Sequence, residues 1–339
     1  MSDLLLQLIQ YSIDRRNSLT VIPSAEEWEI LFESSCKQAI AGVCFSGLSE
    51  LFASRAESVS FLPESLYYRW AGMAFEIQRR NDSMNAACSS LLGELSGMGL
   101  RSCILKGQGA ALNYGQLAEL RNPGDIDIWV DADKDAVVAA AARLGITDTP
   151  SYLHVCTSFS GIPVELHFRP TYCRQASYNR KMQDFCKRHT SDWSQIDGLV
   201  VPSWYFNSVY MPSHIFRHLF GFGVGLRQLM DYYFLLINRP DDVILSDLDA
   251  DLCAVGLRPF IGALMFIMKE VFLIDDGCLI CAPDRERGAA LLSDVMEYGN
   301  FGQMDCKSRK TIGHYGRLLR MYPYEMLSLP VWKLRRSFD

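Results

Sequence analysis

The sequence predicts an α+β protein in which a small mixed β-sheet lies between two mostly helical regions. Apolar residues recur at helical spacing in residues 1–99 and 171–339, whereas residues 100–170 alternate short apolar strands with short helices. Hydrophobic residues make up 49% of the 339 positions, a fraction typical of folded globular proteins rather than disordered chains. We therefore expect an N-terminal helical region (1–99), a sheet core (100–170) and a C-terminal, mostly helical region (171–339).

The N-terminal region contains helix signals but no group of catalytic side chains. Ser24 precedes two glutamates, an arrangement typical of a helix N-cap followed by acids in the first turn. From Pro63 to Leu95 the apolar residues are spaced as on a helix, which predicts two long helices or one bent helix. The pattern stops at Gly97-Met98-Gly99, where glycine allows the backbone conformation that ends a helix.

The core region predicts a compact sheet with helices on one face. Asp133 is placed to cap a helix that ends at Gly145, and Ser160-Gly161 is placed to turn a hairpin. The other strands and short helices of this region are predicted at residues 100–105, 108–114, 125–130, 151–159 and 163–168.

Two aspartates at the start of the second core strand predict a cation site. Side chains two apart on a strand point to the same face, so Asp125 and Asp127 share one side of the sheet. Two carboxylates that close repel each other unless a cation lies between them. Mg²⁺ is the expected ion, with Mn²⁺ as the second choice, because it is held by one or two carboxylates together with substrate phosphates. Two isolated aspartates on a strand more often belong to a solvated face than to a metal site, so the assignment depends on the residues around them.

The turn before this strand supplies groups suited to phosphates. Lys106-Gly107-Gln108-Gly109 combines a cation with glycines that let a ligand approach the backbone at the start of a helix. Arg121, four residues before Asp125, can add a planar guanidinium fork. Each feature is weak alone, but their order is consistent with one site for a phosphate-bearing substrate and its metal.

This order of motifs resembles the signature of nucleotidyltransferases of the DNA polymerase β-like superfamily. The most similar group is the bacterial family of uncharacterised nucleotidyltransferases, and the pattern is also similar to abortive-infection toxin, lincosamide and aminoglycoside nucleotidyltransferases. The usual Gly-Ser or Gly-Gly pair of the superfamily is Gly107-Gln108 here. The residues that carry the resemblance are Leu105, Lys106, Gly107, Tyr114, Arg121, Gly124, Asp125, Ile126 and Asp127.

The resemblance implies a third carboxylate on a later strand, and Glu165 is the candidate. Glu165, His167 and Arg169 alternate with apolar residues, so they line one face of a strand. A half-exposed strand with a polar face would look the same. The resemblance implies that Glu165 completes the metal site or acts as base. His167 is expected either to orient a phosphate or the acceptor or to be a satisfied structural histidine, and Arg169 is expected to contact phosphate.

The C-terminal region adds polar side chains at helical spacing. Pro212 is expected in the first turn of a helix that carries His214 and His218, a spacing that can hold zinc although no third ligand is evident. Arg227 and Asp231 are one turn apart and can form a weak surface ion pair. The resemblance implies instead that His218, Arg227 and Asp231 line the acceptor side of the site.

Composition limits the possible partners and locations. Lys and Arg total 33 and Asp and Glu total 39, so a net charge of −6 disfavours a general nucleic-acid binder, although a local basic cleft stays open. No basic leader or apolar run of about 20 residues is present, so a cytoplasmic location without membrane contact is expected. The 11 cysteines do not suggest a disulfide framework, and the role of Cys278 and Cys281, the only C-x-x-C pair, is open.

The leading functional hypothesis is metal-dependent transfer of an NMP group from an NTP to a hydroxyl of an unidentified acceptor. A nucleotide-binding regulatory or toxin-system protein without turnover is the alternative, favoured by the altered Gly107-Gln108 loop, and a helical interaction scaffold is the third. The nucleotide base and oligomeric state are open. The predicted metal ligands are Asp125, Asp127 and Glu165, and the predicted substrate contacts are Lys106, Gly107, Gln108, Gly109, Arg121, Gly124, His167, Arg169, His218, Arg227 and Asp231.

Overall fold

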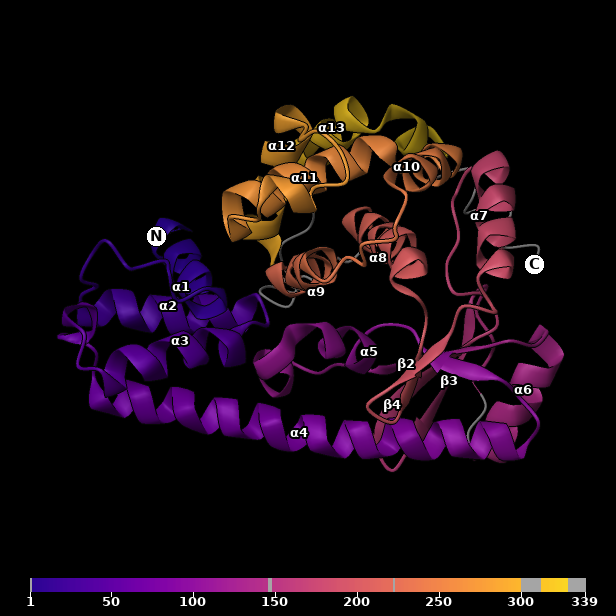
Figure 1. Cartoon of the computed structure of the whole chain (residues 1–339), viewed down its shortest axis with the longest axis horizontal. Helices are drawn as coiled ribbons and strands as arrows, with labels where there is room; N and C mark the ends of the chain where they lie inside the picture. The colour runs from indigo at the N-terminus through magenta and orange to yellow at the C-terminus, as the bar shows by residue number, and fades with distance from the viewer. Residues whose placement is uncertain (1, 146–147, 222, 300–311, 329–339) are drawn as a thin grey trace.

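The computed structural model describes the chain except for residues 1, 146–147, 222, 300–311 and 329–339. The predicted α+β class is confirmed, because a four-stranded mixed sheet and a two-stranded sheet lie among helices from both ends of the chain (Figure 1). Among the described residues, no helix is long and apolar enough to cross a bilayer. The ten described cysteines are all free.

The N-terminal helices begin and end at the predicted signals. The side chain of Ser24 accepts a hydrogen bond from the Glu27 amide, and the Glu27 carboxylate accepts one from the Ser24 amide. The segment after Pro63 is one 34-residue helix, and it ends before Gly99, whose φ is +77°. The elements are α1 (Ser2–Ile13), α2 (Ala25–Lys37), α3 (Ala41–Ala53), η1 (Glu57–Val59) and α4 (Glu64–Gly97).

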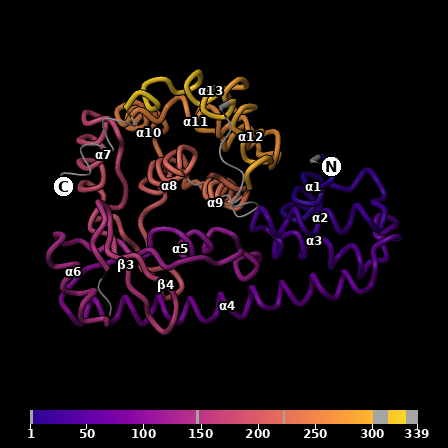
Figure 2. The backbone as a smooth tube through the Cα atoms, turned by 180° about the vertical axis from the view of Figure 1, so that it is seen from behind, coloured from indigo at the N-terminus to yellow at the C-terminus, as the bar shows by residue number. Residues whose placement is uncertain are grey.

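Helix α4 joins the N-terminal helices to the sheet. It runs beneath α1–α3 and continues beneath the strands, and the view from behind in Figure 2 shows the same path. Its C-terminal half contributes Leu91 and Leu95 to an apolar cluster that includes Ile126, Ile128 and Leu166 of the sheet. The domain boundaries at residues 99 and 170 stay a prediction.

The sheet has the order β1-β2-β4-β3, with β2 and β4 parallel and the two outer pairs antiparallel. Ser160 and Gly161 turn the β3–β4 hairpin as predicted, both with positive φ. The core elements are β1 (Ser102–Ile104), α5 (Gln108–Ala111), η2 (Leu112–Leu120), β2 (Ile126–Val130), α6 (Lys134–Arg143), β3 (His154–Phe159) and β4 (Ile162–His167).

The two faces of the central strands differ in chemistry. Ile126, Ile128 and Val130 of β2 and Val164 and Leu166 of β4 share one cluster with α4 and α6. Strand alternation therefore places Asp127, Glu165 and His167 on the opposite face. That face is directed toward α8 and α9, which lie above the sheet in Figure 1.

The C-terminal region is mostly helical, as predicted, and Ser194–Ile196 and Leu199–Val201 form a short antiparallel strand pair. The elements are α7 (Ala176–Arg188), β5 (Ser194–Ile196), β6 (Leu199–Val201), α8 (Trp204–Leu219), α9 (Leu226–Ile237), α10 (Leu245–Ala254), α11 (Arg258–Phe272), η3 (Asp276–Cys278), α12 (Arg285–Tyr298) and α13 (Ile312–Met321).

The expectation that Pro212 lies in the first turn of its helix is wrong. Helix α8 begins at Trp204, after the N-cap Ser203, and Pro212 lies inside it. A proline within a helix leaves the carbonyl four residues earlier without its amide donor. Here that carbonyl belongs to Ser208, and the hydroxyl of Tyr232 on α9 donates to it at 3.2 Å. A tertiary contact therefore makes the internal proline tolerable.

Helices from the two ends of the chain pack on each other. The Gln38 side chain donates to the Val295 carbonyl at 2.9 Å and accepts from the Leu226 amide at 2.9 Å. The Gln10 side chain donates to the Val271 carbonyl at 3.1 Å. These contacts attach the C-terminal helices above the sheet to α1 and α2.

Candidate active site

Three carboxylates converge at the junction of β2 and β4. Asp127 and Glu165 are direct neighbours in the parallel register, and Asp125 precedes β2 on the same side. Oxygens of the three groups lie within 4.8 Å of one another. Asp127 is only 1% exposed, whereas Asp125 and Glu165 are half-buried. The arrangement can hold a divalent cation because oxygen donors from three acids surround one point.

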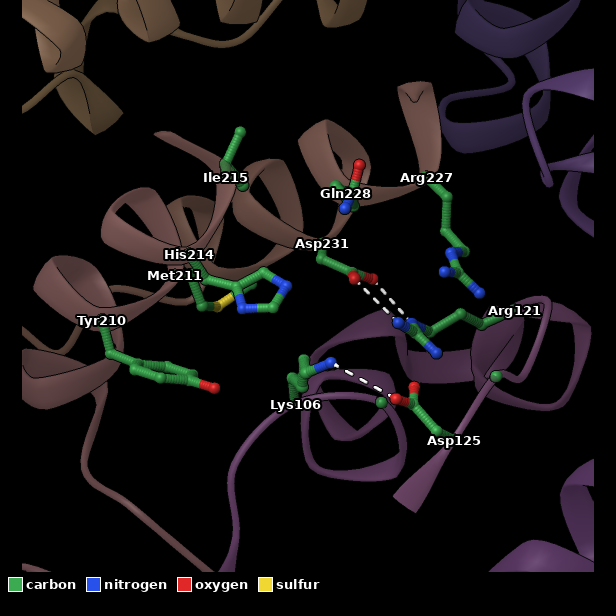
Figure 3. Close-up of a pocket in the computed structure, with 12 residues that line it drawn as sticks. Lys106, Arg121, Asp125, Tyr210, Met211, His214, Ile215, Arg227, Gln228 and Asp231 are labelled. Atoms are coloured by element: carbon green, nitrogen blue, oxygen red, sulfur yellow. Dashed lines mark hydrogen bonds and ion pairs between the residues drawn. The ribbon is translucent and has the colours of Figure 1, made fainter. Parts of the chain in front are cut away.

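The ammonium of Lys106 lies against these acids. Its Nζ is 2.8 Å from Oδ2 of Asp127 and 3.8 Å from Oδ2 of Asp125, and Figure 3 shows it directed toward Asp125. Burial lowers the pKa of Lys106, but the charges of Asp127, Asp125 and Glu165 outweigh burial and leave the pKa raised. The lysine is therefore charged, and it neutralises the carboxylates directly.

Two histidines contact the same acids from the other side. The Nε2 of His167 lies 3.0 Å from Oδ1 of Asp127 and 3.2 Å from Oε2 of Glu165, and Nδ1 of His154 lies 3.3 Å from the same Glu165 oxygen. Burial raises the pKa of Glu165, but His167, Lys106 and His154 more than offset it and lower the pKa to about 2. Glu165 is consequently ionised across the physiological range.

His154 was missed by the sequence analysis, although a signal existed. In a two-residue hairpin, residues equally distant from the turn face each other. His154 and His167 are equally distant from Ser160-Gly161, and they are partners in the β3–β4 register. The hairpin prediction therefore contained the pairing of the two histidines.

The loop after β1 depends on its glycines. Gly107 has φ +60° and ψ −111°, and a Cβ there would lie 3.3 Å from the Asp125 carbonyl oxygen. A Cβ on Gly109 would lie 3.0 Å from the Ile104 carbonyl oxygen, and the Gly109 amide donates to the Lys106 carbonyl at 3.1 Å. The two glycines keep the loop tight against the strands.

Gln108, the unusual residue of the loop, is turned toward α4. Its amide nitrogen donates to Asn85 at 2.7 Å and to Asn81 at 3.2 Å, and the residue is 3% exposed. Asn81 in turn donates to the carbonyls of Glu119 and Arg121. Gln108 therefore braces the loop, and its side chain does not line the cavity described below.

Arg121 forms a buried ion pair with Asp231 of α9. Its Nε and Nη2 donate to the two Asp231 oxygens at 2.6 and 2.8 Å, and the Tyr114 hydroxyl donates to Asp231 at 2.6 Å. The side chains of Arg121 and Asp231 are 5% and 8% exposed. Nη1 of Arg227 donates to the Asn122 carbonyl at 3.0 Å. Tyr114, Arg121, Arg227 and Asp231, all of them predicted or motif residues, therefore lie together. Both donor positions of the Arg121 fork are bonded to the Asp231 carboxylate rather than left open for a phosphate.

A cavity that is partly open to solvent lies between the loop and helices α8 and α9. Figure 3 shows Lys106, Asp125, Arg121 and Asp231 on one side of it and residues of α8 on the other. The predicted residues in its wall are Lys106, Gly107, Arg121, Gly124, Asp125, Arg227 and Asp231, and the others are Tyr210, Met211, His214, Ile215 and Gln228.

Some predicted residues lie outside this wall. Arg169 donates to the Tyr152 carbonyl at 2.9 Å and lies over the Tyr152 ring. The rings of His218 and His214 are 4.3 Å apart, and burial lowers the pKa of His218 to about 3, with a further contribution from Arg217. Neither member of this histidine pair belongs to a described group that could hold a metal, so the zinc alternative gains no support.

Comparison with known proteins identifies the family. Residues 24–273 match the family described as uncharacterised nucleotidyltransferase. The chain belongs to this family. No curated protein and no solved structure matches it. The match to the uncharacterised nucleotidyltransferases runs from the start of α2 to the end of α11, so it includes every residue of the cavity wall and of the acidic cluster.

Proposed function

We propose that this nucleotidyltransferase moves an NMP group from an NTP to a hydroxyl group of an acceptor. The observation that carries the proposal is the convergence of Asp125, Asp127 and Glu165 beside a lysine-bearing glycine loop. The family match supports a nucleotide as substrate. The identity of the acceptor is left open, and the cavity between the loop and α8 is the place where we expect it to meet the nucleotide.

The acidic cluster has the donor set expected of a Mg²⁺ or Mn²⁺ site. The buried Asp127 oxygen at 2.8 Å from the Lys106 ammonium already requires a positive charge beside it. A bound divalent ion would stabilise charge on the α-phosphoryl group and the pyrophosphate leaving group, and would make the acceptor hydroxyl more acidic.

We assign Glu165 to the metal site rather than to proton transfer. A general base works best when its pKa is near the working pH, whereas the pKa of Glu165 is held at about 2. Such a carboxylate binds a cation well but takes a proton poorly. The choice between the two roles implied by the superfamily therefore follows from the charges of His167 and Lys106 around it.

Positive charge for the triphosphate comes from one lysine and two arginines. Lys106 would exchange its contact with Asp127 for a phosphate once a metal ion neutralises the acids. Arg121 and Arg227 both face the cavity. Asp231 neutralises the guanidinium of Arg121, so the two arginines together contribute one net positive charge. His218, one turn from the cavity-lining His214, would act on the acceptor side only through that neighbour.

The test is pyrophosphate release with each of the four NTPs, with Mg²⁺ or Mn²⁺, beside a direct measurement of NTP binding. Asp127→Asn should abolish release and leave the circular dichroism spectrum unchanged. Asp131→Asn is the matched control, because Asp131 directly follows the same strand and is exposed. Release that is equal in Asp127→Asn and wild type would refute the mechanism.

A second outcome would favour the alternative without turnover. Gln108 contacts α4 and the Gly109 amide bonds within its own turn, so these two loop groups are engaged inside the protein. Metal-dependent NTP binding with no release, tested across a panel of hydroxyl acceptors, would identify a nucleotide-binding regulatory protein. Absence of NTP binding would leave the helical scaffold hypothesis.

A further inference from the structure

Nitrogen donors stand next to the acidic cluster. Nε2 of His167 and Nδ1 of His154 both approach the same oxygen of Glu165, at 3.2 and 3.3 Å. Potential ligand atoms of the three residues all lie within 4.8 Å of one another. The sequence analysis expected metal ligands only among the carboxylates and a substrate role for His167, so metal binding by the two imidazoles goes beyond that expectation.

The ring of His167 is oriented as that of a metal ligand. Its Nδ1 lies 3.3 Å from the Arg169 carbonyl oxygen, which can only accept a hydrogen bond, so this nitrogen carries a proton in both the neutral and the charged ring. The other nitrogen, Nε2, faces the carboxylates of Asp127 and Glu165, and a metal ion bound there would replace the proton that Nε2 donates to them. Metal-binding histidines generally donate their second ring nitrogen to a carbonyl or carboxylate in this way.

The separations fit one coordination sphere. With metal–ligand bonds of about 2.1 Å, neighbouring ligand atoms are about 3.0 Å apart in an octahedron and about 3.4 Å apart in a tetrahedron. The contacts of His167 with Asp127 and Glu165, and of His154 with Glu165, measure 3.0, 3.2 and 3.3 Å. A protonated His167 bonded to two carboxylates would have similar separations, and the experiment below separates the two.

Asp127 offers one oxygen to each of two cation positions. Its Oδ2 contacts the Lys106 ammonium on the side of Asp125, and its Oδ1 contacts His167 on the other side. Asp127 is 1% exposed, so both oxygens depend on positive partners within the protein. One position is therefore lined by oxygens alone, and the other by two imidazoles together with Glu165.

We propose that His154, His167 and Glu165 bind a divalent transition metal, with Zn²⁺ as its probe, beside a Mg²⁺ position at Asp125 and Asp127. Imidazole ligands suit zinc, iron and nickel, whereas Mg²⁺ selects oxygen. The inference deepens the proposed function by making the centre a mixed two-metal site, in which the carboxylates of Asp127 and Glu165 lie between the ions.

Isothermal titration calorimetry tests the site. Zn²⁺ is titrated into the protein in a buffer that contains excess Mg²⁺ and no nucleotide. We expect one Zn²⁺ per chain in the wild type and an affinity loss of more than about 100-fold in His154→Gln, above the range found for second-shell changes. His189→Gln is the matched control, because His189 also pairs with a carboxylate, that of Asp192. Equal affinity in His154→Gln and wild type, or no Zn²⁺ binding, would overturn the proposal.

Pulsed EPR of the Mn²⁺-loaded protein supplies a second readout. Coupling to imidazole nitrogen is expected in the wild type and in His189→Gln, and should weaken in His154→Gln. Absence of nitrogen coupling with two equivalents of Mn²⁺ bound, enough to fill both positions, would assign His167 to a protonated, hydrogen-bonded role. Because His154 is half-buried on the edge strand β3, its variant should fold even if His167→Gln does not.

The same samples separate this inference from the proposed function. NTP turnover with Mg²⁺ but without zinc affinity or nitrogen coupling would refute the transition-metal site and keep the nucleotidyltransferase. Zinc affinity that depends on His154, without turnover or NTP binding, would keep the metal site and refute the proposed reaction.

Discussion

Replacing Asp231 by asparagine should destabilise the protein strongly, although Asp231 lies far from Arg121 in the sequence. The substitution keeps the shape of the side chain and removes its charge. The guanidinium of Arg121 would then be buried with no anion, because its side chain is 5% exposed and its Nε and Nη2 are both directed at Asp231. The Tyr114 hydroxyl would also lose its charged acceptor.

The expected cost is about 3–5 kcal/mol of unfolding free energy, the range found when one partner of a buried ion pair is removed. Tyr114→Phe should cost about 1.5–3 kcal/mol, the range for a hydrogen bond to a charged group. The two losses should not add, because both variants disturb the same carboxylate. Arg121→Met combined with Asp231→Leu should recover part of the loss, since no buried charge then remains.

Urea unfolding followed by circular dichroism measures these free energies. Asp251→Asn is a matched control, because Asp251 also accepts from an arginine, Arg188, and from a tyrosine hydroxyl, Tyr205. That group lies at the surface, so we expect a loss of at most about 1 kcal/mol. A loss in Asp231→Asn no larger than in this control would refute the view that Arg121 is held by Asp231.

Three further outcomes are expected. Gly107→Ala should cost at least about 1–2 kcal/mol of unfolding free energy and weaken NTP binding, because φ +60° combined with ψ −111° lies in the mirror-β region that only glycine adopts readily. An unchanged midpoint of urea unfolding would contradict this. Gln108→Ala should lower the unfolding free energy by about 1–3 kcal/mol, because the hydrogen bond from Gln108 to Asn85 is lost. Weaker NTP binding without a loss of stability would contradict the structural role of Gln108. Without metal, the stability that the lowered pKa of Glu165 provides is complete above pH 4.5 and lost toward pH 2. The difference in unfolding free energy from Glu165→Gln should shrink over that window, and a constant difference would exclude the effect.

The sequence alone determined the local architecture of the site. Strand alternation placed Asp125 and Asp127 on one face, and the turn signal at Ser160-Gly161 positioned the hairpin that carries Glu165. These features are decided by backbone geometry over a few residues, because the direction of a side chain in a strand repeats every two positions. The helix signal at Ser24 was readable for the same reason, since its capping box lies within four residues.

Only the tertiary structure decided which groups face each other across the site. Arg121, expected at phosphate, is paired with Asp231, and Lys106 contacts the acids themselves. His154 joins Glu165 through the hairpin register, and the Tyr232 hydroxyl permits a proline inside α8. Periodicity fixes where a side chain points within its own element, whereas its partner depends on how distant elements pack, and charged groups buried by that packing must pair with whatever opposite charge it brings near.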